Sequence, residues 1–181
     1  MLNQWKLEKV ISGGQTGADL AGTQAASLLS IETGGWMPKG FKNLPGFHPE
    51  YSLYLGMEET ESADYAPRTR LNVRNSDATI RFATNWVSPG ERYTFQCIKE
   101  ERKPHLDAVG CMELAVSNEE KIQKIVAWLH MVKPKVLNIA GNSEKTSPGI
   151  GDYTYFLLAD VFTRVLLTQR GLPSDKVEGR G

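Results

Sequence analysis

The sequence predicts an α/β fold: a Rossmann-like, doubly wound and mostly parallel sheet with helices on both faces. Three observations lead to it. Short β-branched runs alternate with helical periods about five times, no internal repeat or low-complexity block occurs, and the glycine-rich loops follow strands. Such alternation implies right-handed crossovers between parallel strands. From a length of 181 residues we expect one ligand-binding domain over residues 1–173 and a flexible tail over 174–181.

Elements of the first half are marked by apolar spacing and by turn residues. Residues 9–12 form a short β-branched run closed by two glycines, which predicts a buried strand. Apolar positions recur at helical spacing over 18–30, and a second strand is expected to end within the glycine-rich segment 33–40. Residues 41–65 contain two prolines and two glycines, so we expect a long loop. Pro67 fits the first position of a helix to about residue 75.

The second half repeats the pattern. Residues 78–83 and 136–141 are apolar runs that predict strands, and Lys133-Pro134 ends the helix before the second run. The expected elements are a strand over 78–83, a turn at 88–90, a helix over 91–101, a strand over 104–109, a helix capped by Asn118 that ends at 132, a strand over 136–141 and a helix over 151–169.

Charge and composition disfavour several classes of protein. Lys and Arg number 21 and balance 21 Asp and Glu, so no cationic excess favours nucleic acid or an anionic membrane surface. No run reaches the roughly 18 apolar residues of a membrane span, and the N-terminus lacks the pattern of a secretory signal. Only Cys97 and Cys111 occur, without metal-binding spacing, so we expect buried thiols, no metal site and a cytoplasmic protein.

Four polar, glycine-bearing loops are expected to meet at one edge of the sheet. Residues 12–19, 34–39, 84–90 and 141–149 each follow a predicted strand, and ligands of doubly wound sheets bind outside the carboxyl ends of the strands. Glycines let backbone N–H groups approach an anion, and a helix N-terminus adds a favourable dipole. A phosphorylated or oxyanionic small molecule is therefore the expected ligand class, with plain tight turns as the alternative for any one loop.

Known nucleotide-binding motifs match only in part. In the Gly-x-Gly-x-x-Gly spacing of dinucleotide-binding proteins the positions are Ser12, Gly14 and Gly17, so the first glycine is missing, and no acidic residue ends the second strand. The Gly-x-x-x-x-Gly-Lys-Ser/Thr loop is absent altogether. These departures disfavour a nicotinamide dehydrogenase and a Walker-type nucleotide hydrolase.

Side chains near this edge could define the ligand further. Neutral hydrogen-bonding groups come from Gln15, Thr16, Asn142 and Ser143, and positive charge from Lys39 and Arg68, unless these two are ordinary surface residues. Asp19 would repel a phosphate, so it is expected either to accept from a ligand hydroxyl or amine or to stabilise the start of its helix. Trp36 could stack on a flat heterocycle or simply pack against its neighbours.

The ordered set of these motifs resembles the putative molybdenum carrier (molybdenum cofactor carrier) family. The matching segments are residues 11–19, 34–40, 88–90 and 141–149, together with Tyr65, Arg68 and Asn72 between them. The resemblance implies a Rossmann-like member of the superfamily that contains the Lonely Guy and lysine-decarboxylase-like proteins. It also implies binding and protection of the molybdenum cofactor (molybdopterin), a phosphorylated pterin with an oxyanionic metal, or of a molybdate- or tungstate-like oxyanion.

Partners follow from the same resemblance. It implies molybdoenzymes as recipients of the cofactor, and a homo-oligomer that is a dimer or a tetramer. The final helix supports the oligomer, because its apolar residues between Tyr153 and Leu166 span more of the circumference than one core-facing stripe requires.

Hydrolytic members of that superfamily carry Pro-Gly-Gly-x-Gly-Thr-x-x-Glu, in which glycines hold phosphate and the glutamate serves glycosidic cleavage. Residues 89–97 fill this frame without two of the glycines and with Cys97 in the place of the acid. A thiol cannot replace a carboxylate at neutral pH, so we expect a carrier without turnover. The alternatives are a nucleotide phosphoribohydrolase that acts through an acid such as Glu91, and a sensor of a nucleotide-derived ligand.

The candidate site therefore gathers loop residues from all four strand ends and two side chains of the helix that follows Pro67. No catalytic residue and no metal ligand is assigned. The candidate ligand-binding residues are Gly13, Gly14, Gln15, Thr16, Gly17, Asp19, Gly35, Trp36, Lys39, Arg68, Asn72, Ser88, Pro89, Gly90, Gly141, Asn142, Ser143, Pro148 and Gly149.

Overall fold

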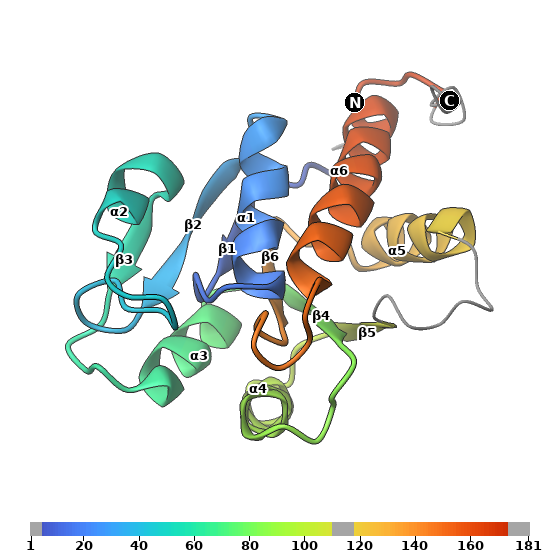
Figure 1. Cartoon of the computed structure of the whole chain (residues 1–181). Coiled ribbons are helices and arrows are strands. Elements are labelled where there is room, and N and C mark those ends of the chain that lie inside the picture. Colours follow the sequence, from blue (N-terminus) through green and yellow to red (C-terminus); the bar gives the residue numbers. More distant parts are fainter. Residues whose placement is uncertain (1–4, 110–117, 174–181) are drawn as a thin grey trace.

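The computed structural model describes residues 5–109 and 118–173. Its strands form one parallel six-stranded sheet in the order β3-β2-β1-β6-β4-β5, which confirms the predicted fold class (Figure 1). Cys111 and the expected C-terminal tail lie outside the described residues. The elements are β1 Lys9–Ser12, α1 Ala18–Leu28, β2 Glu32–Met37, α2 Glu50–Leu55, β3 Met57–Glu59, α3 Tyr65–Arg74, β4 Ala78–Ala83, α4 Pro89–Glu100, β5 His105–Val109, α5 Asn118–Val132, β6 Val136–Gly141 and α6 Ile150–Gln169.

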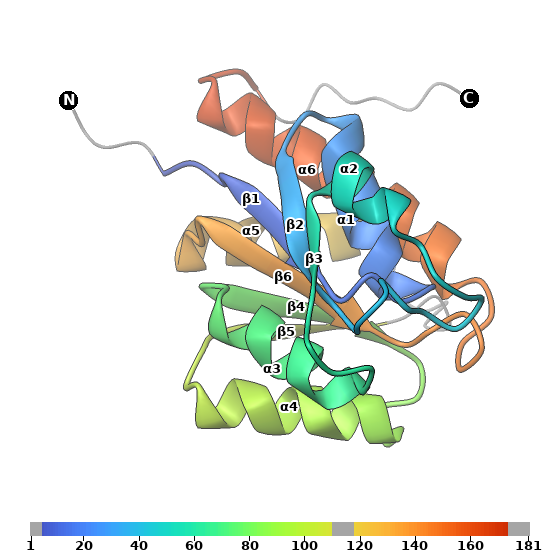
Figure 2. The ribbon, with the colours of Figure 1, turned by 90° about the vertical axis from the view of Figure 1, so that its left-hand side faces the viewer.

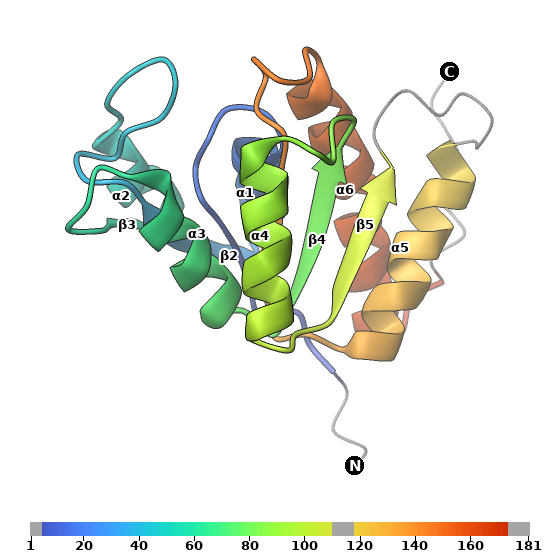
Figure 3. The ribbon, with the colours of Figure 1, turned by 90° about the horizontal axis from the view of Figure 1, so that it is seen from below.

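Helices cover both faces of the sheet. Figures 1 and 2 show α1, α5 and α6 on one face and α3 and α4 on the other. In Figure 3, which views the molecule from the α4 side, α3 and α4 run next to each other in front of the strands. The last strand of the chain, β6, lies between β1 and β4 at the centre of the sheet. The strand order therefore reverses beside β6, and a crevice at the carboxyl ends of β1 and β6 is where such sheets bind ligands.

The core lies against the two central strands. All six residues of β4 are buried, and so are the four inner residues of β6, as expected for parallel strands that are covered on both faces. Phe82, Ile139 and Phe162 are among the largest fully buried side chains. Over the described residues, no helix combines the length and the apolarity that crossing a membrane requires.

The segment 41–65 is where the sequence-based expectation is wrong. Instead of one long loop it contains α2 and β3, with Gly56 in the left-handed region (φ 63°) between them. β3 has only three residues at the edge of the sheet, and Met57 is the one it buries. A strand that short carries no alternation of polar and apolar residues, so pattern reasoning could not find it.

Two helices begin earlier than expected. The helix α3 begins at Tyr65 rather than at Pro67, which is compatible with proline because the first four N–H groups of a helix have no intrahelical partner. The helix α4 begins at Pro89, so Pro89 and Gly90 are helical instead of forming a separate turn. Ser88 caps it by accepting a hydrogen bond from the Glu91 N–H.

Candidate functional site

A cavity of about 430 Å³ opens between α3 and α4, over the carboxyl ends of β1 and β6. Small-molecule sites commonly have volumes of roughly 300 to 1,000 Å³. The lining residues come from the loop after β1, from α3, from the first turns of α4 and from the end of β6: Gly13, Gln15, Asp19, Leu44, Tyr65, Ala66, Arg68, Thr69, Asn72, Ser88, Pro89, Gly90, Glu91, Tyr93, Thr94, Asn138, Ala140, Gly141, Asn142, Ser143 and Thr146.

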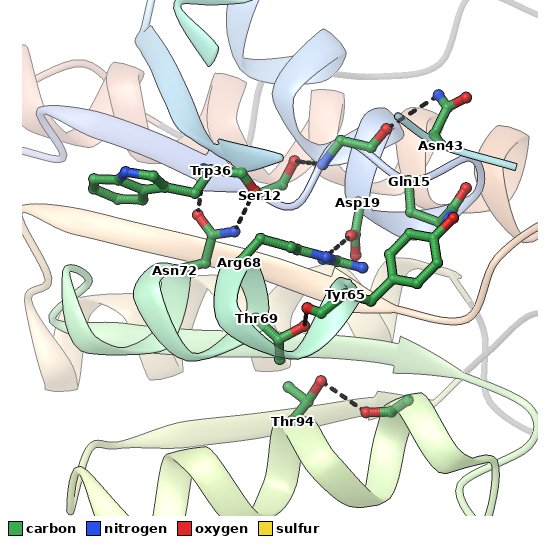
Figure 4. A network of polar contacts seen from close by, with 12 residues as sticks. Ser12, Gln15, Asp19, Trp36, Asn43, Tyr65, Arg68, Thr69, Asn72 and Thr94 are labelled. Carbon is green, nitrogen blue, oxygen red and sulfur yellow. Dashed lines mark hydrogen bonds and ion pairs between the residues drawn. The ribbon is translucent and has the colours of Figure 1, made fainter. Parts of the chain in front are cut away.

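The loop between β1 and α1 is fixed by its own side chains and by the segment after β2 (Figure 4). The Ser12 hydroxyl accepts a hydrogen bond from Gly14 N at 3.2 Å. Gln15 Oε1 accepts from Thr16 N at 2.9 Å and from Leu44 N at 3.0 Å. Since this oxygen is held by two backbone donors, Gln15 organises the turn in addition to lining the cavity.

A buried ion pair joins this loop to α3. Arg68 Nη1 lies 2.8 Å from Asp19 Oδ2, and only 3% of the Asp19 side chain is exposed. Desolvation raises the pKa of Asp19, and the Arg68 guanidinium opposes that rise. Gly13 makes the contact sterically feasible, because a Cβ atom there would lie 1.5 Å from Arg68 Nη1. Figure 4 shows Arg68 reaching Asp19 beside Tyr65, whose ring centroid is 5.7 Å from Arg68 Cζ.

A second carboxyl group lines the cavity from the first turn of α4. Glu91 is 2% exposed, and burial raises its pKa from 4.5 to about 7. Arg81 on β4 opposes this rise only in part, with Nη1 at 3.4 Å from Glu91 Oε2. The same guanidinium donates to Asp107 through Nε at 2.8 Å and Nη2 at 2.6 Å, so Glu91 shares its counter-ion.

Asn142 connects β6 to the loop before α4. Its Oδ1 accepts from Thr84 N at 3.0 Å, from Asn85 N at 2.9 Å and from Ser147 Oγ at 2.8 Å. Its Nδ2 donates to Asn85 O at 3.2 Å and lies 3.5 Å from Glu91 Oε1. The Asn142 amide is therefore engaged by the protein, and its contribution to the cavity is to position the two loops.

Eleven candidate residues, more than half of the sequence-predicted set, line the cavity. They are Gly13, Gln15, Asp19, Arg68, Asn72, Ser88, Pro89, Gly90, Gly141, Asn142 and Ser143. Asn72 lines it with its amide already committed, because Oδ1 accepts from Trp36 N and Nδ2 donates to Trp36 O, both at 2.9 Å. It thereby holds α3 against β2.

The other candidates do not line it: Gly14, Thr16, Gly17, Gly35, Trp36, Lys39, Pro148 and Gly149. Gly14 has φ 65°, and a Cβ atom there would lie 2.6 Å from Met37 Sδ, so this glycine is needed for packing. Figure 4 shows the Trp36 ring directed away from Asp19 and Arg68, and Lys39 is exposed. The start of α6 is occupied by Glu144, which accepts from Gly149 N and Gly151 N at 2.8 and 2.6 Å.

The candidate set omitted several polar side chains that α3, α4 and β6 contribute: Tyr65, Thr69, Tyr93, Thr94 and Asn138. Two signals could have found some of them. Tyr65, Arg68, Thr69 and Asn72 recur at the spacing of one helix face, which makes a polar stripe. Asn138 is a polar residue in the middle of an otherwise apolar strand, where only a functional or hydrogen-bonding role explains it.

The Cys97 interpretation is not supported by the geometry. Cys97 is fully buried in a cluster with Val73 and Ile98, and it does not line the cavity. Two carboxyl groups, those of Asp19 and Glu91, line it instead. A frame that begins at Pro89 therefore does not identify the acid of this site, and the argument from Cys97 against turnover has no structural basis.

The cavity offers two chemically different zones. Gly90 and the hydroxyls of Ser88 and Ser143, from the start of α4 and the loop after β6, form its rim, where the N-terminus of α4 favours an anion. Its floor holds the carboxyl groups of Asp19 and Glu91 and the amide of Asn138. Among the residues that the structure describes, no group of three or more His, Cys, Asp or Glu could hold a metal ion.

Comparisons with known proteins agree with this architecture. A family model described as the circularly permutated YpsA SLOG family matches residues 10–162. The crystal structure of a putative molybdenum carrier protein from Syntrophus aciditrophicus SB is similar to this chain, with 34% identity and a TM-score of 0.77 over 87% of this chain and 96% of that one. None of the curated proteins gives a significant match. The expected resemblance to the putative molybdenum carrier family is confirmed, and the chain belongs to the circularly permutated YpsA SLOG family.

Proposed function

We propose that this chain binds and carries the molybdenum cofactor, a phosphorylated pterin with an oxyanionic metal, in the cavity between α3 and α4 without converting it. The observation that carries the proposal is the position of the cavity: it opens at the carboxyl edge of the sheet, where the loop after β1 meets the start of α4. The similar solved protein, named a putative molybdenum carrier, supports the choice of ligand.

The charges of the side chains that line the cavity suggest where the anionic groups of the ligand would bind. The carboxyl groups of Asp19 and Glu91 would repel a phosphate or an oxyanion at the floor, so the anionic groups belong at the rim. There Gly90, which is exposed, lets the backbone approach, and Ser88 and Ser143 bring hydroxyls. The metal would enter with its pterin, as part of the cargo.

The test starts from the freshly purified protein, whose released small molecules are identified by mass spectrometry. We expect a phosphorylated pterin. A Gly90→Asp variant should lose it, because a Cβ atom at Gly90 meets no atom within 4 Å and the added carboxylate would occupy the rim. The matched control is Ser52→Asp, which adds an exposed acid to the first turn of α2, away from the cavity. Retention of the ligand by Gly90→Asp would remove this rim from the site.

Free molybdate and tungstate serve as simpler probes of the same site. Either oxyanion can use only the rim donors, whereas the complete cofactor also buries its heterocycle, so we expect the oxyanions to bind more weakly. Equal affinities would favour a simple oxyanion binder.

Recipient molybdoenzymes are the partners that the carrier role implies. A cytoplasmic location belongs to the same proposal, since Cys97 is a free buried thiol.

A nucleotide phosphoribohydrolase is the second candidate function. One observation favours it: the cavity contains Glu91, a buried acid whose pKa of about 7 suits proton transfer at neutral pH. Incubation with nucleoside monophosphates, followed by measurement of the released base, decides between the two functions. Release of base by the wild type that is lost in Glu91→Gln would establish the hydrolase. Nucleoside monophosphates that stay intact would support the carrier.

We also propose that the chain forms a homo-oligomer, a dimer or tetramer, through the outer faces of α1 and α6. Most of the apolar residues of α6 belong to the core, with Leu157 at 4% and Val161 and Val165 at 0% exposure. Phe156 and Leu28 remain 67% and 62% exposed beside a groove between these two helices. Light scattering at micromolar concentration should give a multiple of 20.1 kDa, and a mass of one chain would contradict the proposal.

A further inference from the structure

Two of the most deeply buried polar side chains that line the cavity offer free hydrogen-bond acceptors. Glu91 and Asn138 are each 2% exposed and line the cavity from opposite elements, α4 and β6. Asn138 Nδ2 donates to Thr79 Oγ1 at 3.2 Å, which leaves Asn138 Oδ1 buried with no partner. A buried acceptor without a donor is costly, so this floor suits a ligand that brings donors.

The Glu91 carboxylate has acceptor capacity to spare. Its two side-chain contacts, from Arg81 Nη1 at 3.4 Å and Asn142 Nδ2 at 3.5 Å, are long compared with the ~2.7 to 2.9 Å of a charge-assisted hydrogen bond. The donors of Arg81 point mainly at Asp107, at 2.8 and 2.6 Å. Each carboxylate oxygen can accept about two hydrogen bonds, so both oxygens of Glu91 can receive a further N–H from a ligand.

We propose that Glu91 and Asn138 bind the donor edge of a flat heterocycle, namely the adjacent N–H and amino groups of a 2-amino-4-oxopyrimidine ring, as found in pterins and in guanine. The inference rests on the proposed function, because it needs this cavity to be the ligand site. Two parallel N–H groups match the two oxygens of one carboxylate, as in bidentate recognition generally. The phosphate of the same ligand then lies at the rim, away from both acids.

The arrangement discriminates between heterocycles by their donors. Hypoxanthine keeps the ring N–H but has no amino group beside it, so it can make one of the two bonds. Adenine presents a ring nitrogen lone pair at the corresponding edge, which would face the carboxylate lone pairs. Rejection of a ligand that leaves a buried charged group unpaired is stronger than rejection by shape alone. The expected order of affinity is therefore pterin and guanine, then hypoxanthine, then adenine.

The charged groups around Glu91 predict a second measurable effect of ligand binding, the release of protons. Arg81 from β4 and Arg68 from α3 favour its ionised form, while Asp107 from β5 and Asp19 from α1 oppose it, and burial dominates. With the pKa near 7, part of the population carries a proton on Glu91 at neutral pH. A donor edge binds only the ionised carboxylate, so binding should release protons. Calorimetry in two buffers of different ionisation enthalpy measures that release.

The experiment uses the full chain and four probes: neopterin monophosphate and the 5′-monophosphates of guanosine, inosine and adenosine. In calorimetric titrations near pH 7 we expect the pterin and guanosine compounds to bind at least about tenfold more tightly than the adenosine compound, because the adenine edge leaves the buried carboxylate without its hydrogen bonds. The Glu91→Gln variant should reduce this preference to less than about threefold, since the amide replaces one acceptor by a donor. It should also abolish the proton release.

A second variant protects the test against misfolding. Asn138→Leu removes the unpartnered acceptor, together with the donor to Thr79, while it keeps the number and branching of the side-chain heavy atoms, and it should weaken the guanosine compound about tenfold relative to wild type. Equal affinities for the guanosine and adenosine compounds in the wild type would overturn the inference and leave the cavity as a ligand site. Absence of binding by every probe and of any released pterin would overturn the proposed function as well. Comparison of the affinities for neopterin monophosphate and guanosine 5′-monophosphate also decides which of the two ring systems the cavity binds.

Discussion

Two arginine–carboxylate pairs flank the cavity, and they are built differently. On the α3 side, Arg68 Nη1 lies 2.8 Å from Asp19 Oδ2. On the α4 side, Arg81 Nη1 lies 3.4 Å from Glu91 Oε2, because its guanidinium also holds Asp107. Asp19 therefore has a close counter-ion of its own, whereas Glu91 has a distant, shared one.

The difference separates a structural role from a binding role. The close pair ties α3 to the start of α1 across the cavity wall. The loose pair leaves a carboxyl group that is buried, incompletely hydrogen-bonded and directed at the ligand space. Both sides pair an arginine with a buried carboxyl group, so the geometry of the counter-ion decides which acid is available for recognition.

The first prediction removes the close counter-ion. Arg68→Ala should lower the free energy of unfolding by roughly 3 to 5 kcal/mol at pH 8, because it leaves the carboxylate of Asp19 buried and unpaired. Urea denaturation measures the loss. The double variant Arg68→Ala with Asp19→Asn should recover most of it, since no buried charge remains. A loss below about 1 kcal/mol for the single variant would mean that the pair does not lock α3 in place.

The second prediction concerns the loose pair and pH. Folded Glu91 keeps its proton up to a pKa of about 7, whereas the unfolded chain loses it near 4.5, so the folded state binds more protons between these values. The wild type should therefore lose stability as pH rises through this window, by roughly 3 kcal/mol in total. Glu91→Gln should lack this loss.

The measurement is the difference in Tm between Glu91→Gln and the wild type from about pH 5 to pH 8. It should grow in favour of the variant as pH rises. Because Asp19, whose pKa is also raised, is present in both proteins, its own titration largely cancels in the difference. A difference that stays constant over this range would show that Glu91 ionises in the folded state as it does in the unfolded chain.

The sheet could be predicted from the sequence because its signals are local. Apolar runs such as 78–83 and 136–141 predict the central strands, and the glycine pair at 13–14 predicts the end of the first strand. The strand order could not be predicted, because it depends on β6 inserting between β1 and β4. Burial was equally hidden from the sequence: the frame over residues 89–97 ends on Cys97, which packs with Val73 and Ile98 and does not line the cavity.

The site could be predicted only where loops follow strands. Gly13, Asp19 and Gly90 were found in this way, and each lines the cavity. The pairing of Asp19 with Arg68 spans 49 positions in the chain, and that of Glu91 with Arg81 depends on how α4 packs on the sheet. Such pairings depend on the tertiary structure. The two acids could therefore be named from the sequence, but their roles could not be assigned.

The last and smallest effect concerns the packing beneath the two pairs. Cys97 on α4 packs against Val73 of α3, so it joins the helices that carry Arg68 and Glu91. Cys97→Ala should cost about 1 kcal/mol of stability through a small cavity. It should change the dissociation constant of guanosine 5′-monophosphate by less than about twofold, since no polar contact of the cavity is lost. Denaturant titration and calorimetry on one preparation measure both quantities. A large loss of affinity at this modest cost in stability would mean that helix spacing, rather than the contrast between the two counter-ions, governs recognition.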